Sequence, residues 1–295
     1  MLKKAVQWVK SNSLDGCCVP VSDRQHTPYP EVTGYWIPTF LQVGEHELAE
    51  KFAKFLISVQ NPDGSFSLDN ANDKYVFDTG QVIRGWVSIA SRLPEVLEPM
   101  HRACQWIVSG ADPLTGKFMA PAPGGAWNLG VRGEVSEGIH TYTIQPMREA
   151  AEILGAPHIR QAADRALQAY IATLDLTNFA RPHALTHFYA YIQEALVETG
   201  HRDLAIEGMN SVAQYQQSNG SVPAYFDVPW ICSPGLAQLA KVWYMLGEKR
   251  RADAGLGFLR SLQNYTGGFY GSYGPFSEYF PADEIGYHRI WPWTS

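Results

Sequence analysis

The sequence has few charged residues and no long hydrophobic run. Of its 295 residues, 18% are charged, below the ~25% of an average globular protein. The 23 basic and 29 acidic residues leave a net charge of −6, which disfavours a nucleic-acid partner. No apolar run approaches the ~18 residues of a membrane span, and the N-terminal segment lacks the apolar stretch of a signal peptide. We therefore expect a cytoplasmic protein without a membrane span.

Cysteine is also scarce, and the common cofactor motifs are missing. Four cysteines are too few for a disulfide framework, and the adjacent Cys17 and Cys18 could form only a strained bridge. His26 lies near this pair, but without the CxxC or HxxxH spacing of a zinc site. The sequence contains neither GxGxxG nor GxxxxGK[ST]. We expect reduced thiols, no metal and no organic cofactor.

Aromatic residues, in contrast, are plentiful. Nine Trp and fifteen Tyr contribute to an aromatic content of 13%, within a hydrophobic content of 45% that excludes a disordered chain. This composition suits a large buried core with an aromatic-lined cleft. A length of 295 residues is compatible with one domain, and we interpret residues 1–295 as a single domain.

Two kinds of helical segment alternate along the chain. The first kind is amphipathic and is expected at residues 2–12, 48–60, 100–111, 159–174, 203–217 and 251–263. The second kind is apolar on most faces and is expected at residues 33–44, 79–93, 141–155, 184–200 and 233–247. Counted from a Thr or Ser at or near each start, namely Thr33, Thr79, Thr141, Thr186 and Ser233, the intervals are 46, 62, 45 and 47 residues. The longest interval contains a Gly/Pro-rich insertion at residues 121–133.

This alternation predicts an all-α fold, an (α/α)6-type toroid in which buried inner helices form a ring and amphipathic outer helices cover it. Six outer and five inner helices are visible in the pattern. The sixth inner helix is expected near Asp283–Ile285, but Pro292 follows within a few residues. We therefore expect a short or incomplete last inner helix, and an apolar face that a second copy of the chain could cover.

The turn Gln60-Asn-Pro-Asp-Gly-Ser-Phe66, which follows an outer helix, resembles the repeat of the prenyltransferase and squalene-cyclase toroids. The alternation also resembles the six-hairpin glycosidases and the toroidal polysaccharide lyases and uronate epimerases. The resemblance implies a fold rather than a reaction. The chain lacks the DxDD acid motif of terpene cyclases, and its Asp227 and Cys232 do not have the zinc-ligand spacing of protein prenyltransferases.

The N-termini of the inner helices should meet at one end of the ring, and polar or aromatic residues gather at these starts. The catalytic candidates are Glu31, Asp78, Glu134, Glu137, His140 and His187. The substrate-binding candidates are Tyr35, Trp36, Gln81, Arg84, Tyr142, His183, Tyr189, Trp230 and Tyr287. Helix capping, packing of aromatic side chains or hydrogen bonding of a structural histidine would explain many of them singly. Their convergence on one end of the ring favours a functional site.

Such a site suits an oligo- or polysaccharide, because aromatic rings stack on sugars and polar groups bind hydroxyls. We expect glycoside hydrolysis, with Glu31 or Asp78 facing Glu134 or Glu137 across the ring as the acid–base pair.

Three other functions stay open. A lyase or uronate C5-epimerase would use His140, His187, Tyr142 or Tyr189 as the base, with Arg84 neutralising the uronate. A terpenoid-handling enzyme would use the aromatic rings to stabilise carbocations. A non-catalytic glycan-binding toroid would use the same residues without chemistry.

Overall fold

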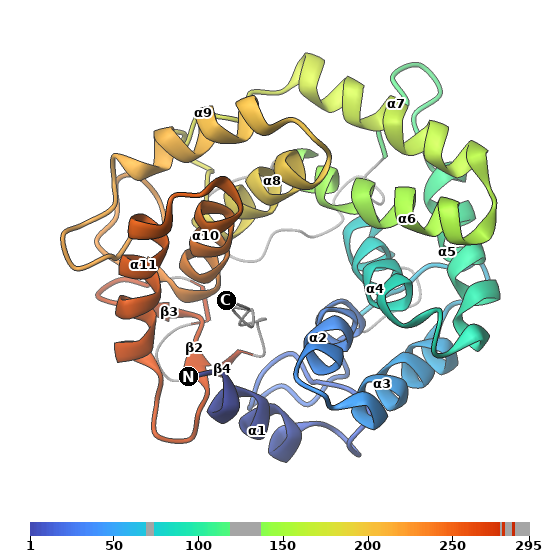
Figure 1. Cartoon of the computed structure of the whole chain (residues 1–295), viewed down its shortest axis with the longest axis horizontal. Coiled ribbons are helices and arrows are strands. Elements are labelled where there is room, and N and C mark those ends of the chain that lie inside the picture. The colour runs from blue at the N-terminus through green and yellow to red at the C-terminus, as the bar shows by residue number, and fades with distance from the viewer. Residues whose placement is uncertain (69–73, 119–136, 278, 281–284, 287–295) are drawn as a thin grey trace.

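The computed structural model describes residues 1–68, 74–118, 137–277, 279–280 and 285–286. Its helices form a ring of two concentric layers (Figure 1). The outer helices are α1 (Leu2–Asn12), α3 (His46–Val59), α5 (Leu97–Ser109), α7 (Pro157–Thr173), α9 (Arg202–Ala213) and α11 (Lys249–Leu262). The inner helices are α2 (Pro30–Gln42), α4 (Val76–Ile89), α6 (Ile144–Leu154), α8 (Thr186–Glu198) and α10 (Ser233–Leu246). The alternation predicted from the sequence is confirmed, and the fold is an α/α toroid.

Two 3-10 helices and four short strands complete the structure. The 3-10 helices are η1 (Pro94–Val96) and η2 (Glu137–Thr143), and η2 leads directly into α6. The strands β1 (Ile231–Cys232), β2 (Phe269–Tyr270), β3 (Ser272–Tyr273) and β4 (Ile285–Gly286) form two antiparallel pairs, β1 with β3 and β2 with β4. No helix in the described part of the chain is long and apolar enough to cross a membrane.

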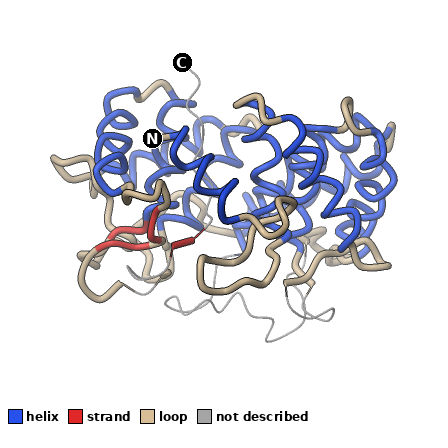
Figure 2. The backbone as a smooth tube through the Cα atoms, turned by 90° about the horizontal axis from the view of Figure 1, so that it is seen from below, coloured by secondary structure: helices blue, strands red, loops and turns tan. Residues whose placement is uncertain are grey.

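Connections on the two sides of the ring differ in length. The chain passes from an inner to the next outer helix in a few residues, as at Gly155–Ala156 between α6 and α7. It returns from an outer to the next inner helix through much longer segments, which lie with the strands on one side of the helical layer (Figure 2). The N-termini of the inner helices therefore share that side, as the sequence predicted.

Inner helices α2 and α4 approach each other closely because glycines stand at their contact. A Cβ atom added at Gly34 would lie 2.7 Å from the carbonyl oxygen of Gln81, and one at Gly85 would lie 2.7 Å from the carbonyl oxygen of Gly34. A larger residue at either position would push the helices apart. These contacts fix the register between the two helices.

A repeated glutamine contact links successive outer helices. After each of α3, α9 and α11, the side-chain amide of a Gln donates two hydrogen bonds. One goes to the backbone carbonyl of the Gly four residues later, and the other goes to a backbone carbonyl at the start of the next outer helix. The acceptor pairs are Gly64 and Pro99 for Gln60, Gly220 and Arg251 for Gln216, and Gly267 and Met1 for Gln263. Each contact ties the turn after one outer helix to the start of the next outer helix.

The last of these contacts closes the ring. Gln263 follows α11, and its amide bonds the carbonyl of Met1 at 3.1 Å, at the start of α1. At the position expected for the start of a sixth inner helix, the described residues Ile285–Gly286 pair with Phe269–Tyr270 as β4 and β2. Residues 283, 284 and 287–295 lie outside the described part of the chain. The described residues at this position thus form a short strand, where the sequence analysis expected a short or incomplete inner helix.

Replacing Gly220 with Ala tests this repeated contact. Gly220 has a φ of +92°, and a Cβ atom there would collide with the carbonyl of Ala254 on α11. Gly247 has a similar φ of +88°, but a Cβ atom there would meet open space. We expect Gly247→Ala to lower the free energy of unfolding by about 1 kcal/mol for the left-handed conformation alone, and Gly220→Ala by about 1–3 kcal/mol more. Equal losses in chemical denaturation would contradict the collision.

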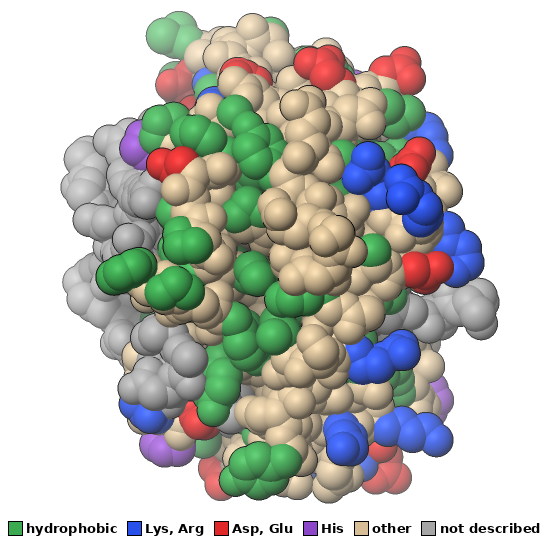
Figure 3. Space-filling view, turned by 90° about the vertical axis from the view of Figure 1, so that its left-hand side faces the viewer, with side chains coloured by type: hydrophobic (Ala, Val, Ile, Leu, Met, Phe, Trp, Pro, Cys, Tyr) green, Lys and Arg blue, Asp and Glu red, His purple; other side chains and the backbone are tan. Residues whose placement is uncertain are grey.

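Hydrophobic side chains lie at the surface as well as in the core. The face that carries α9 and α11 has hydrophobic side chains through its middle and Lys and Arg towards one edge (Figure 3). Large hydrophobic residues that are strongly exposed include Leu114, Tyr265 and Phe276. Association of two copies of the chain stays a prediction.

Candidate functional site

Two buried carboxyl groups lie at the starts of neighbouring inner helices. Glu31 is in the first turn of α2 and Asp78 in the first turn of α4. The helix register set by Gly34 places these two turns level with each other, and the charge of Glu31 acts directly on Asp78. Each residue is only 4% exposed. The two carboxyls therefore form a pair on one sector of the ring.

Burial shifts the ionisation of both carboxyls in the same direction. It raises the pKa of Glu31 from 4.5 to about 7, an effect that the nearby hydroxyls of Tyr29 and Tyr35 partly offset. Burial also raises the pKa of Asp78 well above its usual range, and the negative charge of Glu31 raises it further. Since charges so close in a dry environment resist joint ionisation, the pair keeps a proton near neutral pH.

This pair should make the protein less stable as the pH rises. Glu31 binds its proton more tightly in the folded than in the unfolded chain, so the stability that it contributes is complete below about pH 4.5 and is lost up to about pH 7. The loss amounts to roughly 3 kcal/mol. We expect Glu31→Gln to unfold at higher denaturant concentration than the wild type at about pH 8, and with a weaker pH dependence.

The exposed Glu137 provides the control for this experiment. Its side chain is 55% exposed and pairs with Lys117, so Glu137→Gln should keep the pH dependence of the wild type. A Glu31→Gln variant whose stability changes with pH as steeply as that of the wild type would contradict the shifted ionisation of Glu31.

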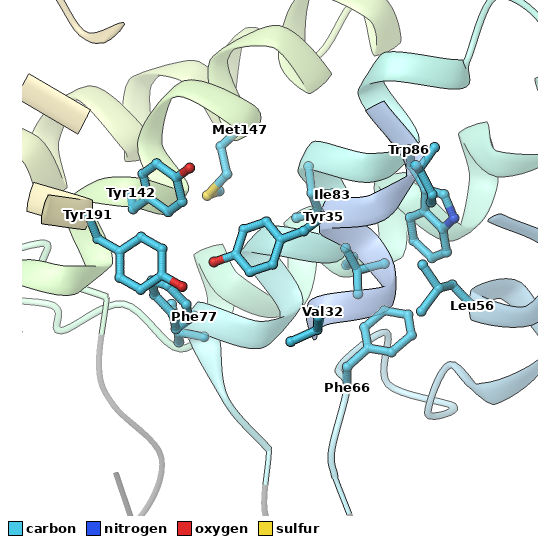
Figure 4. Close-up of a cluster of buried hydrophobic side chains, with 14 of the residues drawn as sticks. Val32, Tyr35, Leu56, Phe66, Phe77, Ile83, Trp86, Tyr142, Met147 and Tyr191 are labelled. Atoms are coloured by element: carbon cyan, nitrogen blue, oxygen red, sulfur yellow. The ribbon is translucent and has the colours of Figure 1, made fainter. Parts of the chain in front are cut away.

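Tyrosines from three inner segments surround the middle of the ring beside this pair. Tyr35 of α2, Tyr142 of η2 and Tyr191 of α8 point toward one another, with Phe77 of α4 behind them (Figure 4). The rings of Tyr35 and Tyr191 stack with centroids 6.3 Å apart, and those of Tyr142 and Tyr191 are 4.8 Å apart. We call Tyr35, Tyr142 and Tyr191 the tyrosine cluster.

His187 joins the tyrosine cluster from its own helix. Its Nε2 atom lies 3.1 Å from the hydroxyl of Tyr191, one turn later on α8. The His187 ring also lies 5.9 Å from the ring of Tyr279. Burial raises the pKa of Tyr279 above its usual range, and the charge of Glu31 contributes to this shift. Tyr191 was not among the sequence candidates, although its spacing of four residues from His187 signals a shared helix face.

Arg84 does reach the tyrosine cluster, but its charge is already matched. Its two terminal nitrogens each donate to a different carboxylate oxygen of Glu198, both at 2.9 Å, and one also bonds the carbonyl of Tyr142. The guanidinium carbon lies 4.1 Å from the centre of the Tyr142 ring. The carboxylate of Glu198, at the end of α8, thus occupies the partner position that a uronate was expected to take.

A second buried charge pair lies on the other side of Tyr142. The hydroxyl of Tyr142 donates to Glu194 at 2.8 Å, and Glu194 also accepts from Gln238 at 3.1 Å and from the ammonium of Lys241. The Glu194 side chain is fully buried, whereas that of Lys241 is 18% exposed. These residues link α8, α10 and η2 across the ring and hold Tyr142 in place.

Four other sequence candidates make packing or hydrogen-bond contacts of their own. Trp36 packs in the core against Phe40, and the hydroxyl of Tyr189 donates to the carbonyl of Thr177. Trp230 is buried against Tyr225. The amide of Gln81 bonds the carbonyl of Phe77 within its own helix, and its oxygen accepts from Arg84. These contacts explain the burial of Trp36, Tyr189, Trp230 and Gln81 through packing.

The third inner helix supplies fewer groups than expected. Glu137 is exposed, so it does not face the Glu31–Asp78 pair from a buried position. His140 is buried next to Tyr170, and burial lowers its pKa to about 4, so the imidazole is neutral at pH 7. His183 is exposed in the segment before α8. Glu134 and Tyr287 lie outside the described residues.

No group of three or more His, Cys, Asp or Glu residues is arranged to hold a metal ion in the parts of the chain that the structure describes. Cys232, at the start of α10, is buried, and burial raises the pKa of its thiol to about 12. A function without metal or organic cofactor stays a prediction.

Comparison with known proteins gives matches at the level of structure. No family model matches the sequence, and no curated protein matches it. An α-amylase from Clostridium perfringens superposes with a TM-score of 0.71 and 11% identity, over 91% of this chain and 90% of that one. A polysaccharide lyase superposes with a TM-score of 0.67 and 11% sequence identity, over 98% of this chain and 90% of that one. The unsaturated glucuronyl hydrolase of Bacillus sp. GL1, which is responsible for the degradation of glycosaminoglycan, superposes with a TM-score of 0.62 and 14% sequence identity. The match covers 89% of this chain and 84% of that one. The chain shares the α/α-toroid fold with these enzymes.

Proposed function

We propose that this protein is a carbohydrate-active enzyme that hydrolyses glycosidic bonds with Glu31 and Asp78. The observation that carries the proposal is the buried carboxyl pair at the starts of α2 and α4. The geometry differs from the sequence hypothesis in one respect, since the two described carboxyls are neighbours on the ring rather than groups facing each other across it.

The ionisation of the pair suits acid–base catalysis. Glycoside hydrolysis needs one carboxylic acid to protonate the leaving oxygen and one carboxylate to act as base or nucleophile. A pair that keeps one proton near pH 7 supplies both forms at once. The shift of Glu31 to about 7 brings its pKa close to neutral pH, where proton transfer is most effective.

The surroundings of the pair suit a sugar. Tyrosine rings offer flat apolar faces for stacking, and their hydroxyls offer hydrogen bonds. The tyrosine cluster lies next to the pair, since Tyr35 follows Glu31 by one turn on α2. The α-amylase, the glucuronyl hydrolase and the polysaccharide lyase with the same fold also act, by their names, on saccharides. These similarities add support to the substrate class.

Product analysis tests the proposal. The purified chain is incubated with a panel of oligosaccharides, and the products are weighed by mass spectrometry. Hydrolysis splits the substrate and adds one water to the combined products. Cleavage without added water, leaving an unsaturated sugar, would instead identify a lyase, and no change in any saccharide would contradict the proposal.

One observation favours the lyase as a second candidate. The Tyr191 hydroxyl and the His187 Nε2 atom are 3.1 Å apart, a distance that allows proton transfer between them. Removing a proton next to a uronate carboxylate also requires a cation to neutralise that carboxylate. Since Arg84 is bound to Glu198 through two hydrogen bonds, this requirement is not met by the residue expected for it.

A further inference from the structure

The charged groups around the tyrosine cluster are unequally matched. Arg84 is paired with Glu198 and Lys241 with Glu194, so each of these two cations already has a carboxylate. Both pairs are largely buried, with side-chain exposures of 12% and 16% in the first and 18% and 0% in the second. Such pairs do not release a charge to a ligand without leaving their partner buried and uncompensated.

Glu31 and Asp78 have no such partner among the residues that the structure describes. Among the described residues, Glu31 lies near the hydroxyls of Tyr29 and Tyr35 and interacts with Asp78, and neither carboxyl forms a salt bridge with a Lys, Arg or His there. The described part of the site therefore presents acidic and neutral groups to a ligand, and the two cations around the tyrosine cluster, Arg84 and Lys241, are each paired with a carboxylate.

One buried hydroxyl, that of Tyr35, is poorly satisfied by the described residues. The Tyr35 side chain is 4% exposed and points toward Tyr142 and Tyr191 (Figure 4). Its hydroxyl is near Glu31 and Tyr191, yet makes no hydrogen bond of ordinary length and angle to any described residue. A buried hydroxyl without a partner is costly, and a ligand hydroxyl would satisfy it.

We propose that the sugar unit bound against Glu31 and Asp78 is uncharged, a neutral hexose unit rather than a uronic acid. This inference rests on the proposed function, because it names the substrate class of the same site. A uronate would bring another negative charge next to two carboxyls that have no cationic partner in the described part of the chain. A cationic amino sugar would favour the ionised form of Glu31 and so remove the proton that an acid catalyst donates.

Matched pairs of ligands test the inference. Oligogalactosides are compared with oligogalacturonides, and oligoglucosides with oligoglucuronides, so that each pair differs in the group at C6. Binding to the full chain is measured by titration calorimetry and products by mass spectrometry. We expect the neutral member of at least one pair to bind at least tenfold more tightly than the acidic member and to be hydrolysed.

A variant of Glu198 shows whether the pairing of Arg84 sets this preference. Glu198→Gln leaves the guanidinium of Arg84 without its carboxylate, so the preference for the neutral ligand should fall at least fivefold. The matched control is Glu152→Gln, which removes the carboxylate of an exposed ion pair with Arg160 and should leave the preference unchanged. If Glu198→Gln does not fold, the comparison of ligands with the wild type still decides.

The outcomes separate the inference from the proposed function. Hydrolysis of the acidic members with tenfold tighter binding than the neutral ones would overturn the neutral substrate and leave glycoside hydrolysis standing. Absence of binding and of products with every saccharide would overturn both.

Discussion

Asp78→Asn and Glu31→Gln are each expected to lower kcat by about 10²–10⁴-fold on any saccharide that the wild type hydrolyses. Each change replaces an ionisable carboxyl by an amide of nearly the same shape. The amide can still hydrogen bond to a sugar, but it can neither donate nor accept a proton at useful pH. Substrate binding should therefore change by much less than kcat. Steady-state kinetics combined with calorimetric binding measures the two effects separately.

Glu137→Gln is the control for these variants, because Glu137 is exposed and paired with Lys117. Its kcat should match that of the wild type. Full turnover in both amide variants, with turnover lost in Tyr191→Phe or His187→Ala, would contradict a hydrolase and favour the lyase. Loss of binding together with turnover in the amide variants would indicate that the carboxyls hold the ligand or the helix starts instead.

Lys241→Met is expected to lower the free energy of unfolding by about 3–5 kcal/mol. The ammonium of Lys241 bonds the fully buried carboxylate of Glu194, which also accepts hydrogen bonds from the neutral side chains of Gln238 and Tyr142. The variant therefore removes the ammonium that bonds this buried carboxylate. Urea denaturation at neutral pH measures the loss.

Lys249→Met on the neighbouring helix α11 is the matched control. Lys249 also pairs with a carboxylate, that of Asp253, but its side chain is 72% exposed. Exposed pairs contribute little, because water solvates both charges when the pair is broken. We expect little change in stability for this variant. Equal losses in the two variants would show that Glu194 finds another counter-charge and would contradict the buried network.

The sequence predicts most of the helical ring because its information is local. Amphipathic and wholly apolar helical segments alternate at nearly constant spacing, and this pattern follows directly from which faces are buried. The pairing of Ile285–Gly286 with Phe269–Tyr270 was missed because it depends on backbone hydrogen bonds between distant segments. Two-residue strands carry no recognisable periodicity of their own.

For the candidate site, the sequence predicts that the N-termini of the inner helices lie on one side of the ring. It does not predict which side chains contact each other there. It puts Glu31 and Asp78 on one side of the ring, while the contact at Gly34 and Gly85 makes them neighbours. Such a register depends on how two helix surfaces fit. The ion pair of Arg84 with Glu198 joins residues 114 positions apart, and no local sequence pattern predicts it.

The central claim is that Glu31 and Asp78 form a buried pair that keeps a proton near neutral pH, and infrared titration of the carboxyl C=O absorption tests it without a substrate. The difference spectrum between the wild type and Glu31→Gln isolates the protonated carboxyl signal that depends on Glu31. We predict that this signal persists through about pH 6 and disappears with a midpoint near pH 7. Disappearance with a midpoint near pH 4.5, the ordinary value for Glu, would contradict the account.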